Sequence, residues 1–157
     1  MGKLKVTVEP GKQEVMMTRV FDAPRELVFK AHIDPKAIPQ WWGQRNSKTT
    51  VDKMEVRDGG RWRFVERGSD GQEHGFHGVF HAIVPSERIV QTFEYEGVPG
   101  HVLLETLTFE EMDGKTLLTG QSVFQSVEDR DGMVAAGMEG GANETHDRLE
   151  ELLASQR

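Results

Sequence analysis

Five turn signals recur about every dozen residues between residues 48 and 124, and strand-forming runs flank each of them. Glycine, proline and aspartate supply the backbone angles that hairpin turns need, so the spacing predicts six consecutive strands in an antiparallel meander. A twisted meander hides one face and needs a cover, which a helix over about 127–153 can supply. The turn signals are Asp58-Gly59-Gly60, Ser69-Asp70-Gly71, Pro85-Ser86-Glu87, Gly97-Val98-Pro99-Gly100 and Asp113-Gly114.

The residues before the meander predict a strand over 14–21 and two short helices, with 4–8 as a further edge strand. Asp22 can cap the first helix and Pro24 fits its first turn. A second helix starts at Asp34-Pro35, and Pro39 limits it to about one turn. We therefore predict an α+β fold, a curved antiparallel sheet wrapped around a long C-terminal helix with two short helices inserted after the first strand.

Length and charge limit the function classes. At 157 residues the chain is predicted to be one domain over 1–157, with its core from about 14 to 155. A net charge of −7 opposes nucleic-acid binding, and the absence of cysteine excludes disulfides and thiolate metal sites. Charges interrupt the first twenty residues, so neither a signal peptide nor a membrane span is expected there. We expect a cytoplasmic protein.

Strand alternation places one face of the meander inward and predicts the lining of a cavity under the helix. In the last strand Leu117, Thr119, Gln121 and Val123 alternate against Leu118, Gly120, Ser122 and Phe124, and periodicity alone leaves both faces open. With two methionines of the helix, the predicted ligand-binding residues are Trp62, Phe64, Phe80, Gln91, Phe93, Leu107, Met133 and Met138. The Trp41-Trp42 pair is expected to anchor the short helices, with a place at the cavity edge as the alternative.

The predicted C-terminal helix has two unlike halves. Its first half contains Gly132, Gly137, Gly140 and Gly141, which together disfavour a helix by roughly 3–4 kcal/mol. This half is therefore expected to be kinked, interrupted, or kept thin for a close approach. Leu149, Leu152 and Leu153 give the second half a packing stripe. The residues expected to face water there are Glu144, Asp147, Arg148, Glu150 and Glu151.

Several motifs together resemble one family over residues 14–155. They are RVFDAPRELVFKAHIDP (Arg19 to Pro35), the Trp41-Trp42 pair, RDGGRWRF (Arg57 to Phe64), IVPSERIVQTF (Ile83 to Phe93), DGKTLLT (Asp113 to Thr119) and GMEGGANETHDRLEELL (Gly137 to Leu153). The chain resembles the SRPBCC superfamily, in the branch like the C-terminal domain of the activator of the ninety-kilodalton heat-shock chaperone ATPase. The resemblance implies the START-like helix-grip fold, whose cavity usually accepts an apolar small molecule.

Chemical candidates are few. If Leu103, Leu107 and Phe109 face the cavity then Glu105 does so too, and a desolvated carboxyl has a raised pKa suited to acid or base catalysis. The alternative is a slip of strand phase that leaves Glu105 outside, paired with a basic neighbour. Gln121 is a candidate polar helper. His74, His77 and His81 lie along one strand, where residues four apart are separated by about 13 Å, so no metal site is expected. We find no motif for a cofactor and expect none.

Three functions follow as expectations. The first is binding of an apolar or aromatic small molecule, lipid-like or polyketide-like, in the cavity. The second is an enzyme of the cyclase or hydratase type that uses Glu105. The third is a protein-interaction domain, acting on a chaperone or as a homodimer. Only about a dozen residues precede the core, with no region for the separate N-terminal domain through which the activator chiefly engages its chaperone, so a chaperone partner is the weaker expectation.

Overall fold

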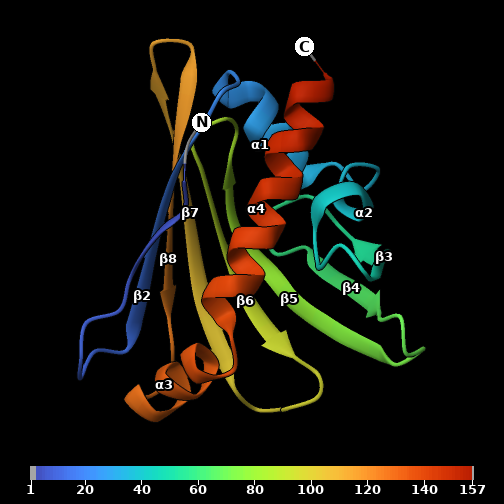
Figure 1. Cartoon of the computed structure of the whole chain (residues 1–157), viewed down its shortest axis with the longest axis vertical. Helices are drawn as coiled ribbons and strands as arrows, with labels where there is room; N and C mark the ends of the chain where they lie inside the picture. The colour runs from blue at the N-terminus through green and yellow to red at the C-terminus, as the bar shows by residue number, and fades with distance from the viewer. Residues whose placement is uncertain (1–2, 157) are drawn as a thin grey trace.

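The computed structural model describes residues 3–156 as a curved sheet that wraps around a C-terminal helix (Figure 1). The described elements, in chain order, are β1 (Lys5–Thr7), β2 (Glu14–Phe21), α1 (Arg25–Ile33), α2 (Ile38–Trp41), β3 (Lys48–Met54), β4 (Arg61–Arg67), β5 (Glu73–Val84), β6 (Arg88–Tyr95), β7 (Val102–Met112), β8 (Lys115–Val123), α3 (Val127–Ala135) and α4 (Met138–Ser155).

The strands form an eight-stranded sheet in the order β1-β2-β8-β7-β6-β5-β4-β3. Strands β3 to β8 pair antiparallel with their neighbours in sequence, which is the predicted meander. Strand β2 adds to the far side through β8, and the short β1 forms the edge. The predicted α+β fold of the helix-grip kind is therefore confirmed.

The two short helices follow β2, but their boundaries differ from the prediction. Pro24 is the N-cap of α1 rather than a residue of its first turn, and its carbonyl accepts from the amides of Leu27 and Val28 at 3.0 and 3.2 Å. Pro39 lies in the first turn of α2 and does not end a helix begun at Pro35. Both outcomes have one reason, since proline lacks an amide hydrogen and the start of a helix needs none.

The C-terminal cover is two helices rather than one. Gly137 separates α3 from α4 with a φ of +94°, in the left-handed region that favours glycine. The sequence predicted that this half is kinked, interrupted or kept thin, and the structure shows an interruption at Gly137. An added Cβ at Gly140 or Gly141 would meet no heavy atom within 4 Å, so these glycines are not explained by a close approach of other chain segments.

The second half of α4 anchors the cover in the core. Leu149 and Leu153 are fully buried against Phe21, Val28 and Phe109. The prediction that Glu150 faces water is wrong, because Glu150 is three residues from Leu153 and shares its buried side.

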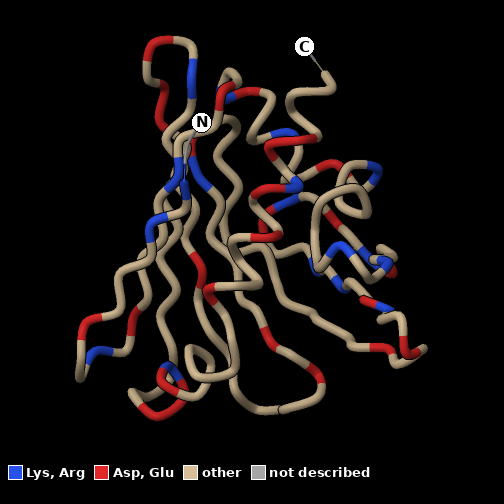
Figure 2. Tube along the Cα trace, in the orientation of Figure 1, with Lys and Arg blue, Asp and Glu red and all other residues tan. Residues whose placement is uncertain are grey.

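Polar contacts fix the other edge of α4. The Arg148 guanidinium donates to the carbonyls of Gln40, Gly43 and Gln44 at 3.1, 2.9 and 3.2 Å. Arg45 in the same loop pairs with Glu151, and Figure 2 shows acidic and basic residues alternating where α4 meets this loop. These contacts tie the segment between α2 and β3 to the helix. No helix within residues 3–156 is long and apolar enough to cross a bilayer.

The break at Gly137 gives a prediction on stability. Replacing Gly137 with Ala forces a side chain into the left-handed region and should destabilise the fold by about 1–2 kcal/mol. Gly140→Ala is the matched control, since its backbone is helical and its Cβ is unobstructed, and it should stabilise by about 0.5–1 kcal/mol. Urea denaturation of both variants measures the difference. Equal effects would contradict the assignment of the break to Gly137.

Candidate functional site

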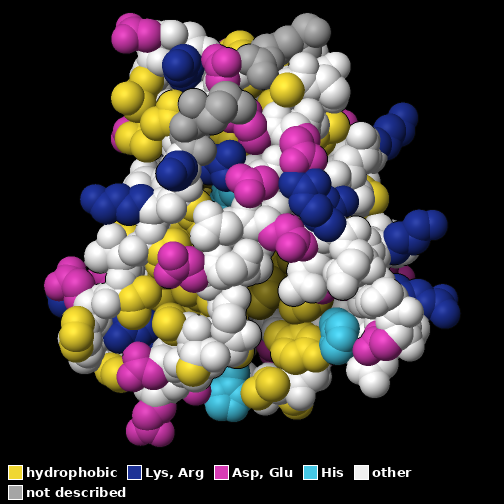
Figure 3. Space-filling view, in the orientation of Figure 1, with side chains coloured by type: hydrophobic (Ala, Val, Ile, Leu, Met, Phe, Trp, Pro, Cys, Tyr) yellow, Lys and Arg dark blue, Asp and Glu magenta, His cyan; other side chains and the backbone are white. Residues whose placement is uncertain are grey.

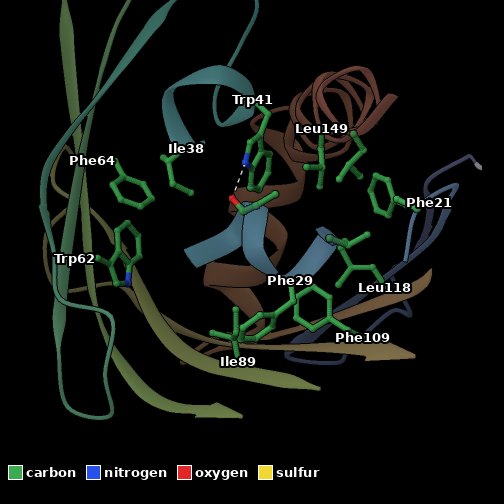
Figure 4. Close-up of a cluster of buried hydrophobic side chains, with 14 of the residues drawn as sticks. Phe21, Phe29, Ile38, Trp41, Trp62, Phe64, Ile89, Phe109, Leu118 and Leu149 are labelled. Carbon is green, nitrogen blue, oxygen red and sulfur yellow. Dashed lines mark hydrogen bonds between the residues drawn. The ribbon is translucent and has the colours of Figure 1, made fainter. Parts of the chain in front are cut away.

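A cavity of about 500 Å³ lies between the concave face of the sheet and the first half of α4. Figure 3 shows hydrophobic side chains in a hollow beside the first turns of α4. Its deep end borders the core of Figure 4, where Trp41, Ile38, Phe64 and Trp62 face one another across the interior. The glycine-rich half of α4 supplies Gly137, Met138 and Gly141 to the wall.

The predicted cavity residues lie together. All eight residues proposed for ligand binding line this cavity: Trp62, Phe64, Phe80, Gln91, Phe93, Leu107, Met133 and Met138. The Trp62 ring is tilted against those of Phe64 and Phe93, with ring centroids 4.7 and 6.0 Å apart. The wall therefore offers flat apolar surfaces.

Strand β8 settles the face that the sequence left open. Leu118, Gly120, Ser122 and Phe124 line the cavity. Gln121 does not line the cavity, so the prediction that it is a polar helper of Glu105 is wrong. Its amide points to the opposite face, where Nε2 lies 3.4 Å from Glu14 Oε2. The alternation of a strand allows only one of these neighbouring sets to face inward.

Glu105 lies in the cavity wall, so the alternative of an outward carboxylate with a basic partner is wrong. It sits on β7 with Gln91 of β6 and Ser122 of β8 as cross-strand neighbours. The Gln91 Nε2 donates to Glu105 Oε1 at 2.9 Å. Burial raises the pKa of the Glu105 carboxyl above its ordinary value of 4.5, and the Gln91 bond opposes this only in part. This pair is a fixed polar point in an apolar wall.

Two histidines that the sequence analysis did not single out also line the cavity. His32 Nδ1 lies 2.8 Å from the Val28 carbonyl, and His146 Nδ1 lies 2.8 Å from the Ala142 carbonyl. Because a carbonyl only accepts, Nδ1 carries the hydrogen in both neutral rings. Burial lowers the pKa of His32 to about 4 and also lowers that of His146.

Arg19 closes the same end of the cavity. Its Nη1 donates to Asp147 at 2.7 Å, and its guanidinium carbon lies 5.1 Å from the centre of the Phe21 ring. The burial of Arg19 and His146 could have been predicted from their spacing to apolar residues. Arg19 alternates in phase with the buried Phe21, and His146 precedes Leu149 by three residues on the buried stripe of α4.

The tryptophan pair has both of its expected roles. Trp41 Nε1 donates to the Ala31 carbonyl at 3.0 Å, which ties α2 to α1 (dashed line in Figure 4). Trp42 meets Phe64 and Phe76 edge to face with ring centroids 5.2 and 5.1 Å apart. Both tryptophans also line the cavity.

The histidines of β5 lie away from the cavity. His74 Nδ1 is 2.7 Å from the Tyr95 hydroxyl, His77 Nδ1 is 2.9 Å from Glu96, and His81 is exposed. Within residues 3–156 no group of three His, Cys, Asp or Glu side chains is placed to hold a metal ion.

Comparison with known families identifies the domain. The profile of the family described as activator of Hsp90 ATPase homolog 1-like protein matches residues 22–154. The chain belongs to this family. It is thus an AHSA1-like domain of the SRPBCC superfamily, as the sequence motifs predicted. No curated protein matches the chain.

Solved bacterial structures share the AHSA1-like fold. A crystal structure from Rhodobacter sphaeroides has 26% identity and a TM-score of 0.89, and the match covers 98% of this chain and 99% of that one. A solution structure from Arthrobacter aurescens has 24% identity and a TM-score of 0.89, with 96% and 91% covered. The crystal structure of Ms6760 from Mycobacterium smegmatis has 22% identity and a TM-score of 0.86, with 95% of each chain covered.

The buried Glu105 predicts a pH dependence of stability. Its pKa is higher in the folded than in the unfolded chain, so the folded state holds this proton more tightly. The stability that this provides is present below about pH 4.5 and is lost as pH rises through the folded pKa. Relative to Glu105→Gln, the wild type should therefore lose unfolding free energy as the pH rises above about 4.5. Urea denaturation of both proteins measures this, and a constant difference would place Glu105 in water.

Proposed function

We propose that this AHSA1-like domain binds an apolar or aromatic small molecule in the cavity between the sheet and α4. The observation that carries the proposal is an apolar space of about 500 Å³, within the range of roughly 300–1,000 Å³ that small-molecule sites occupy. Protein interiors are packed as densely as organic crystals and contain few voids larger than a water molecule. A void of this size is therefore better explained by an occupant than by loose packing.

The glycines of α4 support the same proposal. Gly141 lines the cavity, and a side chain there would meet only open space. Alanine or leucine would favour the helix and fill the void, so glycine at this position lowers stability while it keeps the space open. The flexible thioether of Met138 beside it can adapt to different guests.

The hydrogen-bonded pair of Glu105 and Gln91 limits which chemical groups a guest can carry. Glu105 and Gln91 offer a hydrogen-bonding point in the sheet wall, which also carries the aromatic rings of Trp62, Phe64 and Phe93. A guest of this site has an apolar or aromatic body and a polar group that reaches the pair. One such group in an apolar pocket fixes the orientation of a ligand.

Two leucine variants test the proposal. Gly141→Leu projects into the cavity, whereas Gly140→Leu, one residue away in the same helix turn, lies on the exposed side. Fluorescence titration with N-phenyl-1-naphthylamine, a neutral probe that brightens in apolar sites, should give wild-type affinity for Gly140→Leu and at least about tenfold weaker binding for Gly141→Leu, because the leucine occupies the guest's space. No binding by the wild type, or equal binding by all three, would overturn the proposal. Native mass spectrometry of the protein from its own cells identifies the natural guest.

A second candidate is catalysis by Glu105. The observation that favours it is a cavity-facing carboxyl whose pKa is raised by burial, which suits proton transfer at a bound substrate. Incubation of the recovered guest with wild type and with Glu105→Gln, followed by mass analysis of the small molecule, tests it. Product from the wild type alone would support catalysis, and equal conversion or none would leave a binding protein.

A protein-interaction role has less support. Leu104 and Val123 are exposed and face each other across β7 and β8, and Val79 is exposed on β5. On the neighbouring strands Arg63 of β4 and His77 of β5 pair with Glu96, which directly follows β6. A docking surface needs a larger continuous apolar area than one cross-strand pair. The action on a chaperone that the family's name describes therefore ranks behind ligand binding for this chain.

A further inference from the structure

The two cavity histidines each leave one ring nitrogen without a protein partner. In both rings Nδ1 bonds back to a carbonyl of its own helix, so Nε2, on the other side of the ring, points away from that helix. Neither Nε2 has a hydrogen-bond partner among residues 3–156. Both Nε2 atoms remain accessible from the cavity, whereas the Nε of Arg19 is buried without a partner.

The tautomer fixes what these atoms can recognise. A neutral imidazole with its hydrogen on Nδ1 offers only a lone pair at Nε2, so it accepts and does not donate. Burial disfavours the protonated ring in both residues. The wall formed by α1 and α4 therefore presents two hydrogen-bond acceptors to the cavity, and a complementary guest must carry an O–H or N–H donor.

Burial disfavours a charged donor at this wall. It is the largest cause of the lowered pKa of His146, to which the Arg19 charge adds and which Asp147 opposes, and a buried ammonium group of a guest would carry the same desolvation cost. A hydroxyl suits the site better, because it supplies the donor that an Nε2 atom needs without adding a charge to the buried wall. Phenols and enols, whose hydroxyls are more acidic than those of simple alcohols, gain most from this arrangement.

The two histidines lie apart from Glu105 in the cavity. The His32 ring lies 5.2 Å from the ring of Phe109, and Glu105 is four residues from Phe109 on the same face of β7, about 13 Å along the strand. From these contacts we infer that His32 and His146 form a hydroxyl-recognition site for a neutral aromatic guest of the phenol type. The inference rests on the proposed function. It adds that the guest's hydroxyl lies at the helix wall with His32 and His146, away from Glu105 on the sheet.

A matched set of probes tests the inference. 2-Naphthol donates a hydrogen bond, 2-methoxynaphthalene has the same body and oxygen but no donor, and naphthalene has neither. The wild type should bind 2-naphthol about 2- to 10-fold more tightly than 2-methoxynaphthalene, the range of one neutral hydrogen bond. Because one hydroxyl donates to one acceptor at a time, the double variant His32→Phe/His146→Phe, which keeps both aromatic rings in place, should bring this ratio close to one. His81→Phe, on the exposed outer face, is the control that should leave it unchanged.

A measurement on the unmutated protein guards against variants that fail to fold. In ¹⁵N-histidine-labelled wild type, the Nε2 resonances of His32 and His146 should be those of unprotonated nitrogens. 2-Naphthol should shift at least one of them in the direction of hydrogen bonding, whereas 2-methoxynaphthalene should not. Binding of all three probes with equal affinity and no Nε2 response would overturn the inference and leave the cavity's binding role intact. If no probe binds and the leucine variants have no effect, the proposed function itself is wrong.

Discussion

The burial of the last turns of α4 is the contact on which the rest of the molecule depends. Leu149 and Leu153 lie in the concave core, and Arg148 ties the same end of the helix to the loop after α2. Because a helix is stiff, fixing the C-terminal end of α4 also sets the distance between its first turns and the sheet. The first turns place small or flexible residues, Met138, Gly141 and Ala142, over the space below them, and a cavity results.

Burial acts in opposite directions on the titratable groups of this cavity, for one reason. It raises the pKa of Glu105 and lowers those of His32 and His146, since in each case it disfavours the charged form. Arg19 keeps its charge but shares it with Asp147. The interior is therefore polar at its two ends without a strong net field, which suits a neutral guest better than an ionic one.

The sequence predicted the sheet well, because turn chemistry is local and the residues at Asp58 or Asp113 determine it directly. It predicted less where both sides of an element are similar. Strand β8 carries apolar residues on both faces, so only tertiary packing shows that Leu118 is inward and Gln121 outward. Four glycines marked a break in the helix without locating it at Gly137. Glu150 was predicted to face water, and His32 and His146 were not singled out. A buried stripe is recognised by its apolar residues, so a polar residue on it is assigned to the surface or passed over.

The division of α4 into an anchored and an open half has a consequence for how such a domain can diverge. The residues that hold the helix, Leu149, Leu153 and Arg148, are distinct from those that shape the cavity in its first turns. A substitution at Gly141, where added atoms meet open space, alters the room for a guest without disturbing a core contact. Selection on one short stretch of helix can thus change what the domain accepts while its scaffold stays the same.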